Sequence, residues 1–382
     1  MTKTRDPILT AVSVLGLWAF LYWADHNASE YQVRLLNNCA IFITLAVSYN
    51  LVNGICGQFS LAPNAFLAIG AYTSALLTMT PAEKQLSFII EPLIWPFSAI
   101  SCPYWLSLIA AGSVTAFLAF LMGFPVFRVR GDYLAIVTLG FGETVRVVAN
   151  NLQSVTNGPL GLKGLAPYTN LWWSFGIMVL TVSFIWRLSR SSFGRAMKSI
   201  REDEVAAEAM GVRAFRYKMM AFTISGFFGG VAGGLLAHLI TTISPVLFTF
   251  FLTFNLLIII VVGGLGSITG SAISAVLFIL GGEALRAVEE PFSLGPLEVP
   301  GIPGMRMVIF SVLLVVVMIF ARKGIMGREE FSWGRIIGFM RKIFSPQSTR
   351  RTQRKLHKEA KNKGPTPKAG ELYSRYYVGN FI

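Results

Sequence analysis

Apolar runs long enough to cross a membrane recur along the whole chain of 382 residues. The clearest covers residues 307–320, MVIFSVLLVVVMIF, and contains no charged side chain. About 20 apolar residues cross the hydrocarbon layer as a helix, because lipid offers the backbone no hydrogen-bond partners. A soluble core would instead give shorter runs broken by polar faces. We therefore expect an all-α, polytopic transmembrane bundle of about ten spans (about eight to ten), near residues 8–24, 34–52, 60–79, 105–126, 132–150, 171–188, 218–240, 249–264, 269–286 and 305–322.

Lysine and arginine side chains are distributed unevenly between the segments that join these spans. With an even number of spans both termini lie on one side, and the segments of that side hold 27 of the 33 lysines and arginines. Cytoplasmic segments are enriched in these residues, so we expect both termini in the cytoplasm. The net charge of +14 then reflects membrane orientation and a basic tail, and we expect no nucleic-acid partner.

The chain divides into a transmembrane domain, residues 1–328, and a basic cytoplasmic tail, residues 329–382. Residues 322–382 hold 15 basic and four acidic side chains. Within them FSWGRIIGFMRKIF, residues 331–344, gathers its apolar side chains on one helical side, a pattern suited to the headgroup region of an anionic leaflet. A solvated anchor without further role is the alternative. Beyond Ser345 the composition predicts disorder.

Motifs for catalysis or metal binding are missing from the sequence. The three histidines are scattered and the three cysteines form no CxxC pair, so we expect no metal site. GGLGSITG, residues 263–270, superficially resembles a phosphate-binding loop, but it lacks the terminal Lys-Ser/Thr and follows a membrane span. The chain is expected to be neither an enzyme nor a cofactor-binding protein, and any ATP must be used by another subunit.

A short charged stretch, REDEVAAEAMG at residues 201–211, stands out in a chain with only 14% charged residues. As one helix it places Arg201, Glu204 and Glu208 on a common face. Gly211 is placed to end the helix. An apolar stripe occupies another face and needs a partner, either elsewhere in the same chain or on another protein; it consists of Val205, Ala206, Ala209 and Met210.

Several stretches resemble the branched-chain amino acid permeases of ABC importers. They are EVAAEAMG (204–211), GQFSLAPNAFLAIGAYTSALL (57–77), YLAIVTLGFGETVRVVANN (133–151), TNGPLGL (156–162) and VVGGLGSITGSAISA (261–275). They occur in the family's order, and the resemblance covers roughly residues 33–328. The chain departs from the family at Ala62-Pro63, where Gly-His is common.

The resemblance implies a permease subunit of the bacterial inner membrane that moves branched-chain or related amino acids into the cytoplasm. It implies a homologous permease subunit, two cytoplasmic ATPase subunits and a periplasmic substrate-binding protein as partners, besides the lipid bilayer. The loop 189–217 would dock on an ATPase subunit and transmit its motion. The residues expected to couple in this way are Arg201, Glu202, Asp203, Glu204, Glu208 and Gly211.

Ionisable and helix-breaking residues inside the spans are the candidates for the translocation path. Glu143 and Arg146 lie three residues apart on one helix, and so do Glu283 and Arg286, so each pair can instead be a self-neutralised structural bridge. The full set of path candidates is Asn64, Phe141, Glu143, Arg146, Asn157 and Glu283. Glycines repeat every fourth residue at Gly226, Gly230 and Gly234, a spacing typical of close helix packing in lipid.

Two other functions remain open at this stage. A urea or short-amide permease of the same family would share the fold and the coupling loop. A stand-alone secondary transporter would need a carboxylate deep in the membrane for proton or ion coupling, and the sequence offers little beyond Glu143 and Glu283.

Overall fold

The computed structural model describes residues 5–88, 91–95, 97–128 and 133–286, with short stretches at 292–294, 297–299, 304–305, 308–309, 311–312 and 324–327. The chain divides into two compact units, residues 12–330 and a second unit made of residues 1–11 and 331–382. Most of the expected span at 305–322 and the whole basic tail at 329–382 lie outside the described residues. The larger unit contains all the elements discussed below, except the first residues of helix α1.

The described part of the larger unit is mainly helical. Its α-helices and their bounds are α1 (Arg5–Asn27), α2 (Glu30–Asn50), α3 (Pro63–Thr78), α4 (Pro81–Ser87), α5 (Tyr104–Val126), α6 (Tyr133–Asn151), α7 (Gln153–Thr156), α8 (Leu171–Arg190), α9 (Ser192–Glu202), α10 (Glu204–Ala209), α11 (Ala214–Ile240), α12 (Phe250–Gly263) and α13 (Ile268–Ala284). A π-helical turn, η1 (Leu51–Ile55), extends α2, and η2 (Gly158–Leu160) and η3 (Pro245–Phe248) are 3₁₀ turns.

Local sequence signals explain where several helices begin. Ser29 caps α2 and Thr80 caps α4, and in each case the residue three positions later returns a side-chain hydrogen bond to the cap. Pro63 is the first residue of α3. The expected span began at residue 60, but the helix starts at this proline, which lacks the N–H that a first-turn residue does not need. Residues 57–62 before it are irregular.

Helix α11 forms the centre of the bundle and packs against both α3 and α5. Any Cβ on Gly226 would lie 2.7 Å from the Cβ of Ala119 in α5, and a Cβ on Gly230 or Gly234 would also press on α5. Gly229, on the adjacent face, lies against Phe66 of α3. Without side chains at these positions the three helices approach closely, which in lipid supplies the packing that holds helices together.

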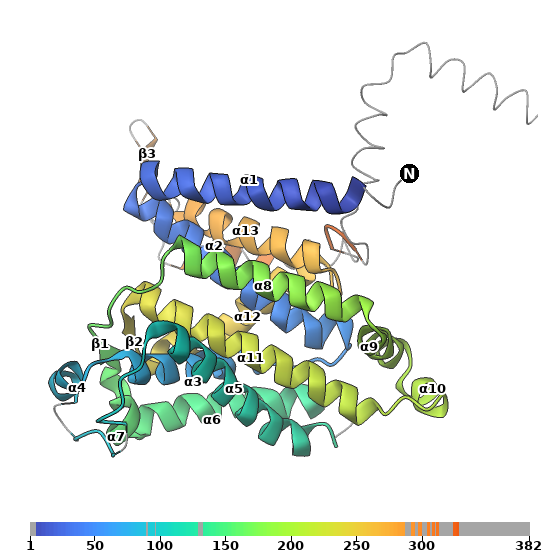
Figure 1. Cartoon of the computed structure of the whole chain (residues 1–382), viewed down its shortest axis with the longest axis horizontal. Helices are drawn as coiled ribbons and strands as arrows, with labels where there is room; N and C mark the ends of the chain where they lie inside the picture. Colours follow the sequence, from blue (N-terminus) through green and yellow to red (C-terminus); the bar gives the residue numbers. More distant parts are fainter. Residues whose placement is uncertain are drawn as a thin grey trace, which may run out of the picture. The chain divides into compact units, whose positions relative to one another are not determined.

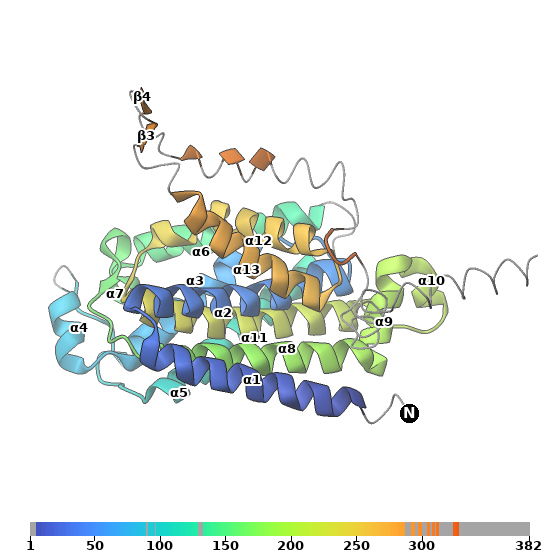
Figure 2. The same cartoon turned by 90° about the horizontal axis from the view of Figure 1, so that it is seen from above.

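The long helices run lengthwise, with different short elements at their two ends (Figure 1, Figure 2). Helices α9 and α10 lie at one end, named here the α9–α10 end, and α4 and α7 lie at the other, the α4–α7 end. At the α4–α7 end β1 (Leu162–Lys163) pairs antiparallel with β2 (Thr242–Ile243). A second antiparallel pair joins β3 (Phe292–Leu294) and β4 (Leu297–Val299).

The expected helical membrane bundle is therefore present. Four helical segments in the described residues are long and apolar enough to cross a membrane: Glu30–Ile55, Tyr104–Val126, Leu171–Arg190 and Ala214–Ile240. Helices α12 and α13 are shorter apolar helices. The number of about ten spans stays a prediction.

Candidate functional site

The charged stretch forms two helices rather than one. Asp203 is extended, with φ −158° and ψ 113°, and separates α9 from α10. Its carboxylate accepts a hydrogen bond of 2.9 Å from the backbone N–H of Ala206 and so caps α10. The expectation that Arg201 shares one helical face with Glu204 and Glu208 is wrong, because this capping aspartate ends the first helix between them.

Arg201 turns back into the bundle from the last turn of α9. Its Nη1 donates a 2.9 Å hydrogen bond to the carbonyl of Gly54 in the π-helical turn, and its Nη2 pairs with Glu202 at 2.7 Å. Its side chain also lies against Gly57 and Gly266. Helix α9 is thereby attached to the end of α2 and to the turn between α12 and α13.

Helix α10 is attached to α11 by charge and by apolar packing. Glu204 forms an ion pair with Lys218, whose side chain is buried. Ala207 is buried in a small apolar cluster with Ile200 and Ala214. Lys218 was not among the sequence candidates, although a lysine at the start of an apolar span is a signal that could have identified it.

The outward surface of α10 carries a stripe of apolar side chains next to charged ones. The predicted stripe of Val205, Ala206, Ala209 and Met210 is exposed, with 72% of Val205 and 85% of Met210 accessible. Gly211 has φ +85° and reverses the chain after α10, as expected of a glycine that ends a helix. The stripe contacts no apolar cluster within the described residues, so it is available to another molecule.

Asn50 is a further linking residue that the sequence reading missed. Its amide donates to the carbonyl of Ser267 at 2.9 Å and to the hydroxyl of Ser271 at 2.8 Å, and its Oδ1 accepts from the N–H of Gly266. It therefore ties α2 to the turn between α12 and α13, next to Arg201. Asn50 could have been identified from the sequence, because it is a polar amide side chain within an apolar span.

Asn64 lies inside the bundle, in the first turn of α3. Its backbone N–H donates to the hydroxyl of Thr253 in α12, and its side-chain amide donates to the carbonyl of Phe248, both at 3.3 Å. Its Oδ1 is buried without a hydrogen-bond partner, and so is the hydroxyl of Tyr72 on the same helix. The ring of Tyr72 lies 6.1 Å from that of Phe248. Two unsatisfied polar atoms thus lie on α3, on side chains that are next to Phe248 of the 3₁₀ turn η3.

The other path candidates are not gathered around Asn64. Phe141 is partly buried beside Gly142, which lies against the Asn64 side chain. Glu143 and Arg146 form an ion pair of 2.7 Å on α6, and Glu283 near the end of α13 forms one of 3.4 Å with Arg286, which follows the helix. Helices α6 and α13 lie on opposite sides of the bundle in Figure 1, so the two pairs are separate.

Asn157 belongs to the α4–α7 end. It is buried, adopts the left-handed conformation with φ +59°, and donates from its amide to the carbonyls of Ser87 and Gly161. Its side chain therefore joins two surface segments. Among the described residues no group of three His, Cys, Asp or Glu side chains is placed to hold a metal ion.

A comparison with protein families assigns the whole bundle to one of them. Residues 31–321 match the model of the permease component of the branched-chain amino acid transport system. The chain belongs to this family of transport permeases.

Individual relatives agree with this assignment. The chain is 34% identical over 324 residues to the high-affinity branched-chain amino acid transport system permease LivM of Salmonella typhimurium, covering 76% of this chain and 70% of the relative. It is 33% identical to LivM of Escherichia coli over the same shares. A guanosine ABC transporter permease of Bacillus subtilis, NupQ, is 24% identical over 48% of this chain and 60% of its own length. No solved structure matches the chain.

Proposed function

We propose that the chain is a membrane-spanning subunit of an ATP-driven importer and moves branched-chain or related amino acids into the cytoplasm. The observation that supports this most strongly is the α9–α10 element. It exposes Val205 and Met210 beside charged residues, while Arg201 fastens it to η1 and Glu204 fastens it to α11. A separate motor subunit needs an element of this kind, which presents an apolar contact and is held rigidly at its base.

In this mechanism the α9–α10 end faces the cytoplasm and contacts an ATPase subunit. The basic residues of this end, at the last turn of α8 and along α9, fit a cytoplasmic surface. ATP-driven movement of α9 would reach the turn η1 through Arg201, and movement of α10 would reach α11 through the Glu204–Lys218 pair. ATP itself is used by the partner, and a homologous permease and a periplasmic binding protein complete the importer.

The translocation path follows the inner side of α3. The unsatisfied Oδ1 of Asn64 and hydroxyl of Tyr72 both belong to α3, and both side chains lie next to Phe248 of η3. A buried polar atom without a partner is costly, so both atoms would gain a hydrogen-bond partner from a polar solute that passes between α3 and η3. A zwitterionic amino acid offers an ammonium donor for the Asn64 oxygen. The Glu143–Arg146 and Glu283–Arg286 pairs act as structural bridges.

The experiment is uptake by the complete transporter, with its ATPase, second permease and binding protein, reconstituted in liposomes. We expect leucine uptake that requires ATP, stops with vanadate and is unaffected when the proton gradient is collapsed. Uptake driven by a proton or sodium gradient without ATPase subunits would contradict the proposal. Guanosine and urea are added as competing solutes to test the cargo. Guanosine is chosen because one relative is a guanosine permease, and urea because a urea permease is the alternative within the family.

A matched pair of glycine variants tests the role of α10. Gly211 and Gly164 both have positive φ, +85° and +74°, and both have open space where a side chain would project. Valine strains the backbone similarly at either position. We expect Gly211→Val, next to α10, to lower ATP-driven uptake at least about tenfold, and Gly164→Val, at the α4–α7 end, to leave most of it. Equal uptake by the two variants would remove α10 from the mechanism.

A further inference from the structure

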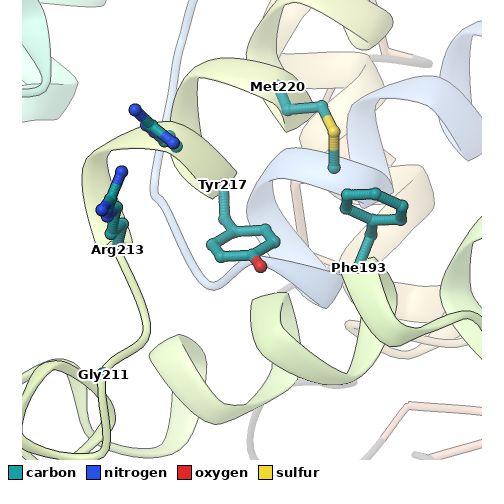
Figure 3. Close-up of a pocket in the computed structure, with 6 residues that line it drawn as sticks. Phe193, Gly211, Arg213, Tyr217 and Met220 are labelled. Carbon is teal, nitrogen blue, oxygen red and sulfur yellow. The ribbon is translucent and has the colours of Figure 1, made fainter.

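A cavity of about 360 Å³ opens beside the α9–α10 element. Figure 3 shows Arg213 on one side of it, Phe193 and Met220 on the other, and Tyr217 between them. The residues that line it come from the start of α9, the turn after α10 and the first two turns of α11: Phe193, Gly211, Arg213, Arg216, Tyr217 and Met220.

The cavity has one cationic wall and one apolar wall. Arg213 and Arg216 are exposed, and neither guanidinium makes an ion pair or hydrogen bond in the part of the chain that the structure describes. The neighbouring Lys218 and Arg201, by contrast, are both paired. Two unpaired guanidinium groups one helical turn apart can bind a phosphate through paired N–H donors, since their planar fork fits its oxygens.

The opposite wall continues a surface suited to lipid. Phe193 is half exposed, and its ring lies 6.3 Å from that of Tyr217. On the adjoining helix α8, Phe184 exposes its ring farther from this end, and Arg190 stacks over Trp186 at 4.0 Å. Aromatic and basic residues gather in this way at the boundary between hydrocarbon and headgroups. This composition is the one expected of a cavity at headgroup depth.

We propose that this cavity binds the headgroup phosphate of an acidic membrane phospholipid. Arg213 and Arg216 hold the phosphate, while Phe193 and Met220 contact the first part of an acyl chain. Basic pockets between helices on the cytoplasmic side take such headgroups. The cytoplasmic placement rests on the proposed function. A free phosphate has no use for the apolar wall, and an acidic side chain of an ATPase subunit would leave Phe193 and Met220 uncovered.

The test uses the complete transporter assembled in nanodiscs of phosphatidylglycerol and phosphatidylcholine. The double variant Arg213→Gln/Arg216→Gln is compared with Arg195→Gln/Lys198→Gln, which removes two charges from α9 outside the cavity. Native mass spectrometry counts the phosphatidylglycerol molecules that stay bound, and thermal melting checks that both variants fold. We expect the first variant to retain phosphatidylglycerol on the order of tenfold less well than the wild type, and the control to retain it normally.

Three results would overturn the proposal. Equal retention by the two double variants would show that the cavity holds no lipid. Displacement of phosphatidylglycerol by millimolar inorganic phosphate would show a general anion site. Unchanged retention with loss of the ATPase subunits from Arg213→Gln/Arg216→Gln would show a protein-docking surface. Leucine uptake by the wild type is measured in parallel, so that failure of the importer function is seen separately from failure of the lipid site.

Discussion

The two ends of the bundle differ in how their polar groups are satisfied. At the α4–α7 end the Lys84 ammonium is buried and donates to the carbonyls of Phe97 and Ile100, and Asn157 joins Ser87 to Gly161. At the α9–α10 end the guanidinium groups of Arg213 and Arg216 are exposed and have no partner in the described chain. The buried polar groups of the first end are therefore bonded within its own chain, whereas the second end carries exposed cations that the described residues leave unbonded.

The largest expected effect is a loss of ATPase binding when an exposed apolar residue at the α9–α10 end, but not one at the α4–α7 end, is replaced by aspartate. Met210 and Leu86 are similarly exposed, 85% and 77%, at the α9–α10 and the α4–α7 end. We expect Met210→Asp to weaken binding of the ATPase subunits by about 2 kcal/mol, roughly 30-fold, because it places a charge in the centre of an apolar contact. Leu86→Asp should leave that affinity unchanged. Pull-down titration of detergent-purified permease with ATPase subunits measures both, and equal losses would abolish the distinction.

A smaller effect is expected when the link inside the α9–α10 end is cut. Arg201→Ala removes the hydrogen bond to Gly54, and a hydrogen bond to a charged group is worth about 1.5–3 kcal/mol. We expect uptake per ATP hydrolysed to fall about tenfold while the ATPase subunits stay bound. Arg195→Ala, on the same helix, loses only an exposed contact with the Arg190 carbonyl and serves as the control. An unchanged ratio in Arg201→Ala would show that α9 transmits no motion through this residue.

The α4–α7 end is tested by removing its buried ammonium. Lys84→Met keeps most of the side-chain volume but leaves the carbonyls of Phe97 and Ile100 without their donor, at a cost of about 1 kcal/mol. We expect faster hydrogen exchange in a peptide covering residues 97–102, where the Cys102 N–H is bonded to Leu77. Lys163→Met, an exposed lysine at the same end, should exchange like the wild type. No difference between the variants would mean that the loop is held by other contacts.

The smallest effect is a dependence on pH. Burial lowers the pKa of Lys84 below its ordinary 10.5, and the nearby Cys102 side chain opposes this shift. Between the lowered pKa and 10.5 the unfolded chain binds the proton more often than the folded one, so this residue's contribution to stability rises with pH. We expect the wild type to gain about 1 °C in Tm relative to Lys84→Met between about pH 8 and pH 10. A fall in the Tm of the wild type relative to Lys84→Met over this pH range would show that the pKa of Lys84 is raised in the folded protein instead.

Much of the fold could be predicted from the sequence because lipid enforces long apolar helices. The expected span at 105–126 corresponds to Tyr104–Val126, and the expected span at 171–188 lies within Leu171–Arg190. The pairing of residues 162–163 with 242–243 could not be predicted, since it depends on two loops far apart in the sequence. The burial of Lys84 was missed for the same reason.

The sequence indicated that residues 201–211 form an exposed charged helical element, but it did not indicate the internal geometry of that element. Regular spacing of Arg201, Glu204 and Glu208 suggested one helix, although Asp203 is a residue type that commonly caps helices. That single cap separates α10 from α9, so Arg201 and Glu204 point to different partners, and the partners of Arg201 are visible only once Gly54 and Gly266 are known to lie beside it. The unsatisfied atoms of Asn64 and Tyr72 likewise depend on the position of η3, which no local pattern specifies.

The contact between Gly54 and Gly266 limits how movement can spread from α9. A Cβ on Gly54 would lie 2.9 Å from the Cα of Gly266, so the two backbones touch with no side chain between them. Side chains absorb displacements by changing rotamers, but main chain pressed on main chain has no such freedom. A push on Arg201 must therefore shift the end of α2 and the turn between α12 and α13 together, in one step and without delay between them.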